Sequence, residues 1–123
     1  MNRFGFEETQ WEAAKAEGKR ILSEYAKQAK TVPYSKFVKE LHSIQLEPHD
    51  PRLAHLLGEI STEEYAAGRG MLSALVVHKD EMLPGTGFFE LAQELGYDIK
   101  NKDAFWIEQV KRVSAAWSRL KKS

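Results

Sequence analysis

The chain has 123 residues, 42% of them hydrophobic, and it contains no cysteine. These values predict one globular domain, residues 1–123, that buries a core without disulfide bonds and without thiolate-bound zinc. The sequence begins without a signal-peptide run, and no stretch approaches the roughly 20 apolar residues of a membrane-spanning helix. We therefore expect a cytoplasmic protein with no membrane partner.

The 18 basic and 18 acidic side chains cancel, which argues against binding of nucleic acid through bulk charge alone. The charges are unevenly distributed, however. Residues 61–97 carry two basic and six acidic side chains, whereas residues 98–123 carry seven basic and three acidic ones. Cations near the end of a C-terminal helix complement its dipole. This basic segment is therefore predicted to be a solvated helix, and the alternative is a surface that faces a polyanion or a protein partner.

The first third of the chain predicts two helices separated by a short extended segment. Residues 7–30 carry an apolar stripe at helical spacing, and Thr9 with Glu12 has the spacing of a capping box. Pro33 disfavours a helical conformation in the residue before it, so residues 31–33 are predicted to be extended. A second, short helix is expected at residues 34–43.

The next segment predicts a helix that starts at Asp50 and Pro51, because aspartate caps a helix end and proline suits the first helical position. Gly58 is expected to end this helix in a left-handed conformation. Ser61 and Glu64 have capping-box spacing and are expected to open a separate helical turn. The apolar residues of the helix recur at the spacing of a core-facing stripe: Leu53, Leu56, Leu57 and Ile60.

The strongest strand signal of the chain is the apolar run at residues 72–77. One short strand is marginal alone, so it needs a partner, for which residues 31–33 are the candidate. A loop with Pro84, a helix at residues 88–95 ended by Gly96, and a last helix at residues 103–121 complete the chain. The predicted fold is α+β and mostly helical, with a small two- or three-stranded sheet.

Three segments, TVPYSKFVKEL, HDPRLAHLLGEI and LSALVVHK, together resemble the layout of a winged-helix domain. Residues 31–96 also resemble the DNA-binding half of the O6-alkylguanine-DNA alkyltransferases, in which a tyrosine opens one helix and an arginine begins the recognition helix, as Tyr34 and Arg52 do here. The resemblance implies a winged-helix-like core at residues 31–87, framed by helices 7–30 and 103–121. It also implies double-stranded DNA as the partner. Separately, SALVVHK followed by PGTGFFELA is similar to a block in small bacterial proteins of uncharacterised function.

The chain departs from the alkyltransferase family at its reactive centre. The family's Pro-Cys-His-Arg signature has no counterpart, since Ser73, Ala74 and Leu75 stand where the alkyl-accepting cysteine is expected. Without a thiolate, alkyl transfer is excluded. The remaining hypothesis on this line is a cysteine-free protein that reads DNA without reacting with it.

A DNA-reading role needs phosphate contacts to position the domain and an element that approaches the bases. Tyr34 would stack on a base, and four cationic or protonatable side chains would contact phosphate, so that the candidate set is Tyr34, Lys36, Arg52, His55 and Lys79. In the alternative reading, Arg52 only pairs with Asp50, and Tyr34 is a half-buried residue at a helix start.

Gly85, Thr86 and Gly87 resemble an anion-binding loop before a helix. They lack the remainder of a P-loop or dinucleotide fingerprint, and Thr86 as a helix cap is the favoured explanation. His78, followed by acidic residues, suggests a hydrolase or nuclease, but the spacing of catalytic carboxylates is absent. We therefore predict no catalytic residue, no metal and no cofactor.

The last helix carries an apolar seam with heptad-like spacing, which is the candidate face for a homo-oligomer: Trp106, Val110, Val113, Trp117 and Leu120. In a chain of this size such a seam usually packs within the molecule. The leading hypothesis is a non-enzymatic DNA-binding module. The alternative is a protein-interaction or small assembly domain that uses the seam, and an enzyme built on His78 is the least favoured.

Overall fold

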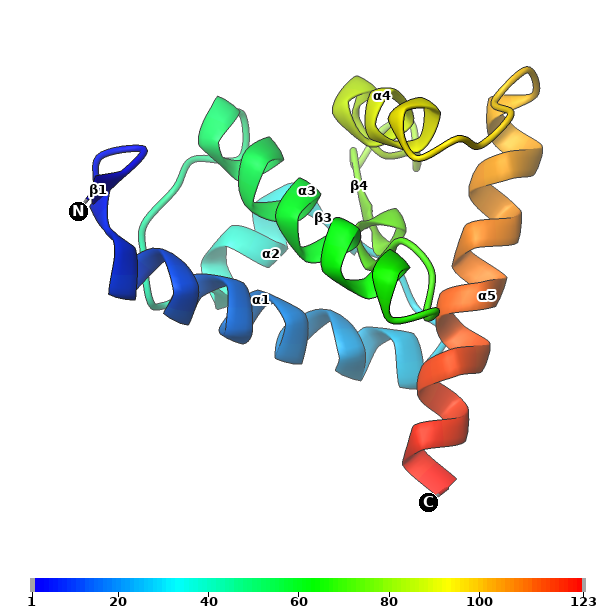
Figure 1. The fold of residues 1–123 in the computed structure, drawn as a ribbon, viewed down its shortest axis with the longest axis horizontal. Helices are drawn as coiled ribbons and strands as arrows, with labels where there is room; N and C mark the ends of the chain where they lie inside the picture. Colours follow the sequence, from blue (N-terminus) through cyan, green and yellow to red (C-terminus); the bar gives the residue numbers. More distant parts are fainter. Residues whose placement is uncertain (1, 123) are drawn as a thin grey trace.

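The computed structural model describes the backbone of residues 2–122 and the side chains of residues 3–120 (Figure 1). The described part of the chain is mostly helical with small strands, which confirms the predicted α+β class. In chain order its elements are β1 (Asn2–Arg3), β2 (Phe6–Glu7), α1 (Glu8–Lys27), β3 (Val32–Pro33), α2 (Tyr34–Glu40), α3 (Pro51–Ala66), the 3-10 helix η1 (Leu72–Leu75), β4 (Val76–Val77), α4 (Thr86–Glu94) and α5 (Lys102–Lys122).

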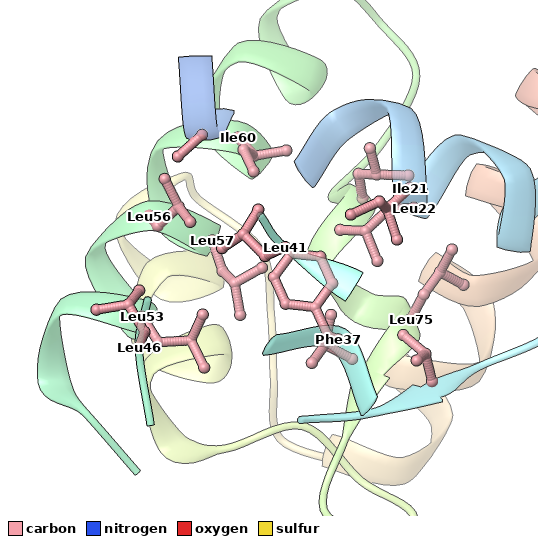
Figure 2. Close-up of a cluster of buried hydrophobic side chains, with 14 of the residues drawn as sticks. Ile21, Leu22, Phe37, Leu41, Leu46, Leu53, Leu56, Leu57, Ile60 and Leu75 are labelled. Atoms are coloured by element: carbon pink, nitrogen blue, oxygen red, sulfur yellow. The ribbon is translucent and has the colours of Figure 1, made fainter. Parts of the chain in front are cut away.

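The helices enclose the small sheet. Helix α1 packs against α3, α5 and η1, while α4 packs against α3 on the far side from α1 (Figure 1). Helix α5 runs at a steep angle past the C-terminal end of α1. The main core lies between α1, α2 and α3, and Figure 2 shows Phe37 of α2 among leucines of α3 and η1.

Close helix packing depends on Gly18 of α1, which is buried. A Cβ atom at this position would lie 3.0 Å from Ile60 Cδ1 and 3.3 Å from Phe37 Cζ. Both distances are tight for carbon–carbon contact. Glycine has a low helix propensity, but at this position its missing side chain lets α1 approach α2 and α3 closely.

The predicted pairing between the two extended segments is confirmed. Strands β3 and β4 are parallel, with Val32 opposite Val76 and Pro33 opposite Val77. The predicted strand at residues 72–77 is wrong in its first four residues, which form η1. A buried side-chain contact holds η1 instead of a strand ladder, because the Ser73 N–H donates to Ser61 Oγ at 2.9 Å and the Ser61 hydroxyl donates to Ser73 Oγ at 2.6 Å.

The predicted break at Gly58 is also wrong, because α3 continues without interruption to Ala66. Ser61 and Glu64 lie inside this helix and are both buried. Ser61 contacts η1, and Glu64 binds Arg69 through hydrogen bonds of 2.8 and 2.6 Å. The spacing that resembles a helix cap thus serves tertiary contacts.

Helix starts were predicted with mixed success. Asp50 caps α3 as expected, since its Oδ1 accepts from the Arg52 N–H at 2.9 Å. The Thr9 cap is wrong, because α1 starts after the extended residue Glu7, whose N–H donates to Gln10 Oε1.

In the C-terminal half, one predicted helix boundary is wrong and one is confirmed. Thr86 is the first residue of α4 rather than its cap, and Gly85 takes the cap position. The predicted end of this helix at Gly96 is confirmed, and Gly96 lies just after α4 with a left-handed φ of +98°. Across the described residues, no helix is both long and apolar enough to cross a lipid bilayer.

Candidate functional site

The parallel strand pair brings two aromatic rings together. Tyr34 directly follows Pro33 of β3, and His78 directly follows Val77 of β4. Because these strands are parallel and in register, their next residues lie side by side. The two ring centroids are 4.8 Å apart with an interplanar angle of 37°.

These rings border a cleft of about 340 Å³ between α3 and α4. Its apolar wall includes Ala54, Leu57, Phe88 and Leu91, and its polar groups come from the helix starts at residues 49–51 and 85–87. A volume of this size is at the lower end of small-molecule binding sites. The cleft therefore fits one planar group of a larger ligand.

The Tyr34 hydroxyl is the best-positioned polar group of the cleft. Its oxygen accepts a hydrogen bond of 2.9 Å from the Gly85 N–H. Burial raises the pKa of Tyr34, and this hydrogen bond only partly opposes the effect, so the phenol is neutral near pH 7. Among the described side chains (residues 3–120) and the described backbone, no acceptor takes the phenol proton. Tyr34 can therefore donate it to a ligand.

Gly85 is fitted closely between the two rings. A Cβ atom there would lie 3.3 Å from both His78 Nε2 and the Tyr34 hydroxyl oxygen. The predicted anion-binding loop, Gly85 to Gly87, does line the cleft. However, the Gly85 N–H is already used by Tyr34, and the Asp50 carboxylate on the same cleft would repel an anion.

Arg52 lies beside the cleft and is held in an ion pair. Its Nε and Nη2 donate to the Asp50 carboxylate at 2.8–3.2 Å, and this bonding lowers the pKa of Asp50. Its Nη1 donates to the Phe4 carbonyl at 3.1 Å, and its guanidinium lies 4.8 Å from the Phe6 ring centroid. The Asp50–Arg52 pair that the sequence left as an alternative is therefore present, and a phosphate contact by Arg52 stays a prediction.

The other predicted nucleic-acid contacts are exposed but dispersed. Lys36 lies on α2 with its ammonium 5.8 Å from the Tyr25 ring centroid, and Lys79 follows His78 in an exposed loop. His55 stacks on Phe4 with 4.6 Å between the ring centroids. The structure thus groups Tyr34 with the glycine loop, and it places Arg52 and His55 on another face of α3.

Sequence reasoning missed His78 as a wall of the cleft and considered it only as a catalytic residue. Its position directly after a predicted strand was the signal that it would lie beside Tyr34. The side chain is exposed, and within residues 2–122 it shows no hydrogen bond to a carboxylate. A general acid or base needs such an orienting partner within reach, so the geometry gives no support to catalysis by His78.

The apolar seam of α5 is largely used inside the molecule. Val113 is fully buried, and Val110 and Trp117 pack against the main core. Trp106 donates from Nε1 to the Ala74 carbonyl at 2.8 Å, while Leu120 is 48% exposed. The seam therefore leaves little exposed apolar surface that a second copy of the chain could bury.

Among the described residues, no group of three side chains is arranged to hold a metal ion. Comparison with family profiles, with curated proteins and with solved structures finds no match for this chain. The resemblance to the alkyltransferases therefore stays a prediction.

Proposed function

We propose that this domain is a non-enzymatic DNA-binding module that holds one unstacked base in the cleft between Tyr34 and α4. The observation that carries the proposal is the cleft, with its volume of about 340 Å³, its apolar wall and the free phenol proton of Tyr34. Proteins that take a base out of the stack hold it between apolar or aromatic side chains and hydrogen-bond its edge. The cleft offers both kinds of contact.

Positive charge next to the cleft supports the same proposal. Lys36 lies two residues after Tyr34, and Lys79 directly follows His78, and both are exposed. Of the two, Lys79 is the residue that directly follows a cleft ring and can contact a phosphate of the bound strand, because the Lys36 ammonium lies over the Tyr25 ring. The later turns of α3 do not suit phosphate, because Glu59 and Glu63 line a groove opposite Glu90 and Glu94 of α4.

A binding role is favoured over a reaction because the cleft lacks an activated nucleophile. Ser73 lines the cleft, but its hydroxyl is engaged with the Ser61 hydroxyl. Activation of a serine needs a general base within hydrogen-bond reach. The Tyr34 phenol has a raised pKa, which makes it a hydrogen-bond donor rather than a base.

The proposal is tested by fluorescence anisotropy with three labelled DNA probes: an intact duplex, the same duplex with one mismatch, and a single strand. We expect the tightest binding where a base is easiest to unstack, and a steep loss of affinity between low and physiological salt. Tyr34→Phe removes the free proton and should weaken binding about three- to tenfold. Tyr65→Phe is the matched control, since its hydroxyl lies outside the cleft on the Leu95 carbonyl.

Because Tyr34→Phe also removes the acceptor of the Gly85 N–H, its thermal stability must be measured alongside. Lys79→Ser is the second test, since this exposed side chain can be replaced without disturbing the core and should lower affinity on all three probes alike. Absence of binding by the wild-type protein to every probe at low salt would overturn the proposal.

A further inference from the structure

The N-terminal hairpin, residues 2–7, lies on the first half of α3. Its strands β1 and β2 are antiparallel, with Asn2 opposite Glu7 and Arg3 opposite Phe6. The turn between them has Phe4 at φ +54° and Gly5 at φ +85°. Left-handed backbone is costly for a bulky residue such as phenylalanine, so contacts outside the hairpin must hold the turn in place.

Those contacts come from α1 and from one face of α3. The Phe4 ring packs on Trp11 of α1, with 4.9 Å between the ring centroids. Arg3 Nη2 lies 2.8 Å from Glu59 Oε2, and the Phe4 ring stacks on His55 at 4.6 Å. The Phe4 carbonyl accepts from Arg52 Nη1 at 3.1 Å. Residues 52, 55 and 59 share a helix face. The hairpin therefore covers Arg52 and His55, the two α3 residues that the sequence predicts to contact phosphate.

We propose that the N-terminal hairpin is a displaceable cover that competes with nucleic acid for Arg52 and His55, an inference that rests on the DNA-binding function proposed above. The polar covering contacts are individually weak, because the side chains of Arg3 and Arg52 are 38% and 39% exposed. A hairpin with two residues in each strand has little stability of its own. Phe6 packs against the core, so the part that moves is residues 2–5.

Release of the hairpin leaves a surface that suits phosphate. Arg52 keeps its pair with Asp50 through Nε and Nη2, whereas Nη1 loses the Phe4 carbonyl and becomes available. Glu59 loses Arg3 but keeps Lys15 at 3.3 Å and the Trp11 indole N–H. The Glu59 carboxylate therefore stays partly neutralised after release, and phosphate approaches the Arg52 end of the face, away from the groove of Glu59, Glu63, Glu90 and Glu94.

The first test opens the cover with the double variant Arg3→Ala, Phe4→Ala. We expect roughly three- to tenfold tighter binding to the best of the three DNA probes. The variant loses one positive charge, which on bulk electrostatics alone would weaken binding, so a gain must come from the uncovered face. Arg20→Ala, which removes an equally basic but 68% exposed side chain on α1, is the control and should lower affinity slightly.

The second test closes the cover and uses the absence of native cysteine. Arg3→Cys with Glu59→Cys gives two unique thiols at an observed contact, which a short bismaleimide can join. The same variant capped with N-ethylmaleimide is the matched control. We expect the cross-linked protein to bind the probe at least threefold more weakly than the capped one. Hydrogen exchange should show residues 2–5 opening while α3 stays protected.

The outcomes separate this inference from the proposed function. Tyr34-dependent binding that is unaltered by opening or locking the hairpin would overturn the cover and leave the DNA-binding function standing. Weaker binding on opening would also overturn it and would make the hairpin part of the contact surface. Binding by both proteins that is tighter for the opened variant would support both proposals, whereas no binding by either protein would overturn both.

Discussion

The buried carboxylate of Glu64 makes the sharpest prediction about stability. Glu64 is fully buried and accepts two hydrogen bonds from Arg69, at 2.8 and 2.6 Å. Lys19 Nζ lies 3.2 Å from the same carboxylate. These contacts join α1, α3 and the chain after α3. Glu64→Gln keeps the size and one acceptor of this side chain but removes its charge.

The size of the effect follows from the exposure of the two cations. Breaking a buried ion pair costs about 3–5 kcal/mol when the partner is left buried. Here the side chains of Arg69 and Lys19 are 31% and 34% exposed, so water can solvate both. We therefore expect a loss of about 2–3 kcal/mol in the free energy of unfolding, or roughly 8–12 °C in melting temperature.

The control is Glu63→Gln on the neighbouring residue, whose side chain is 50% exposed and pairs with Lys15, a cation that keeps Glu12 and Glu59 as partners after the change. This change should cost less than about 1 kcal/mol. Chemical denaturation at pH 7 with a constant m-value measures both variants. If Glu64→Gln lost no more stability than Glu63→Gln, the assigned energy of the buried pair would be refuted.

The same carboxylate predicts a pH dependence. Burial alone would raise the pKa of Glu64, but hydrogen bonds from Arg69 and Lys19 hold the pKa below its ordinary value of 4.5. A group whose pKa is depressed by folding stabilises the protein above its unfolded pKa, and the contribution is lost as the pH falls through the folded pKa. The stability difference between wild type and Glu64→Gln should be constant above about pH 5 and shrink on further acidification.

Two further changes test packing, both by thermal unfolding. Trp106→Phe leaves the Ala74 carbonyl without its 2.8 Å donor and should cost about 1–2 kcal/mol; an unchanged melting temperature would show that water replaces the indole. Gly70→Ala places a Cβ 3.2 Å from Arg112 Cδ at a φ of +87°, whereas Gly96→Ala, at φ +98°, meets no atom within 4 Å. Both variants should lose roughly 1 kcal/mol to backbone strain. Gly70→Ala should lose more than Gly96→Ala because of its contact with Arg112. Equal losses would mean that this contact adds nothing.

Local sequence signals predicted the fold where a residue acts on its own neighbours. Proline at residue 33 fixed an extended segment, Asp50 capped α3, and Gly96 ended α4 in a left-handed conformation. The strand at residues 76–77 pairs with the predicted segment, residues 32–33. A short apolar strand has few other extended segments to pair with in a helical chain. These features follow from backbone sterics and hydrogen bonding over a few residues.

The errors arose where a tertiary contact uses a residue that also has a local meaning. Gly58 has the local character of a helix end but lies within α3 facing α4, where a Cβ would lie 3.8 Å from Leu91. Ser61 and Glu64 have the spacing of a helix cap, but their partners in the structure are Ser73 and Arg69, which local spacing does not indicate. Tertiary packing overrides such local preferences.

The candidate site was predictable only in part for the same reason. Tyr34 and the glycine loop were singled out from their own neighbourhoods, and both do line the cleft. The contact between Tyr34 and His78 depends on strand register. The cover over Arg52 depends on a hairpin of two-residue strands, which is too short to leave a pattern in the sequence.

The parallel pairing of β3 with β4 has a practical consequence for finding what occupies the cleft. Its two rings come from segments far apart in the chain, so the site is assembled only in the native protein and is absent from the denatured ensemble. A compound that fits must therefore shift the folding equilibrium by mass action, at about 2.7 kcal/mol when present at a hundredfold excess over its dissociation constant. A thermal-shift screen of nucleosides and other planar heterocycles would rank occupants without any assumption about their biological origin.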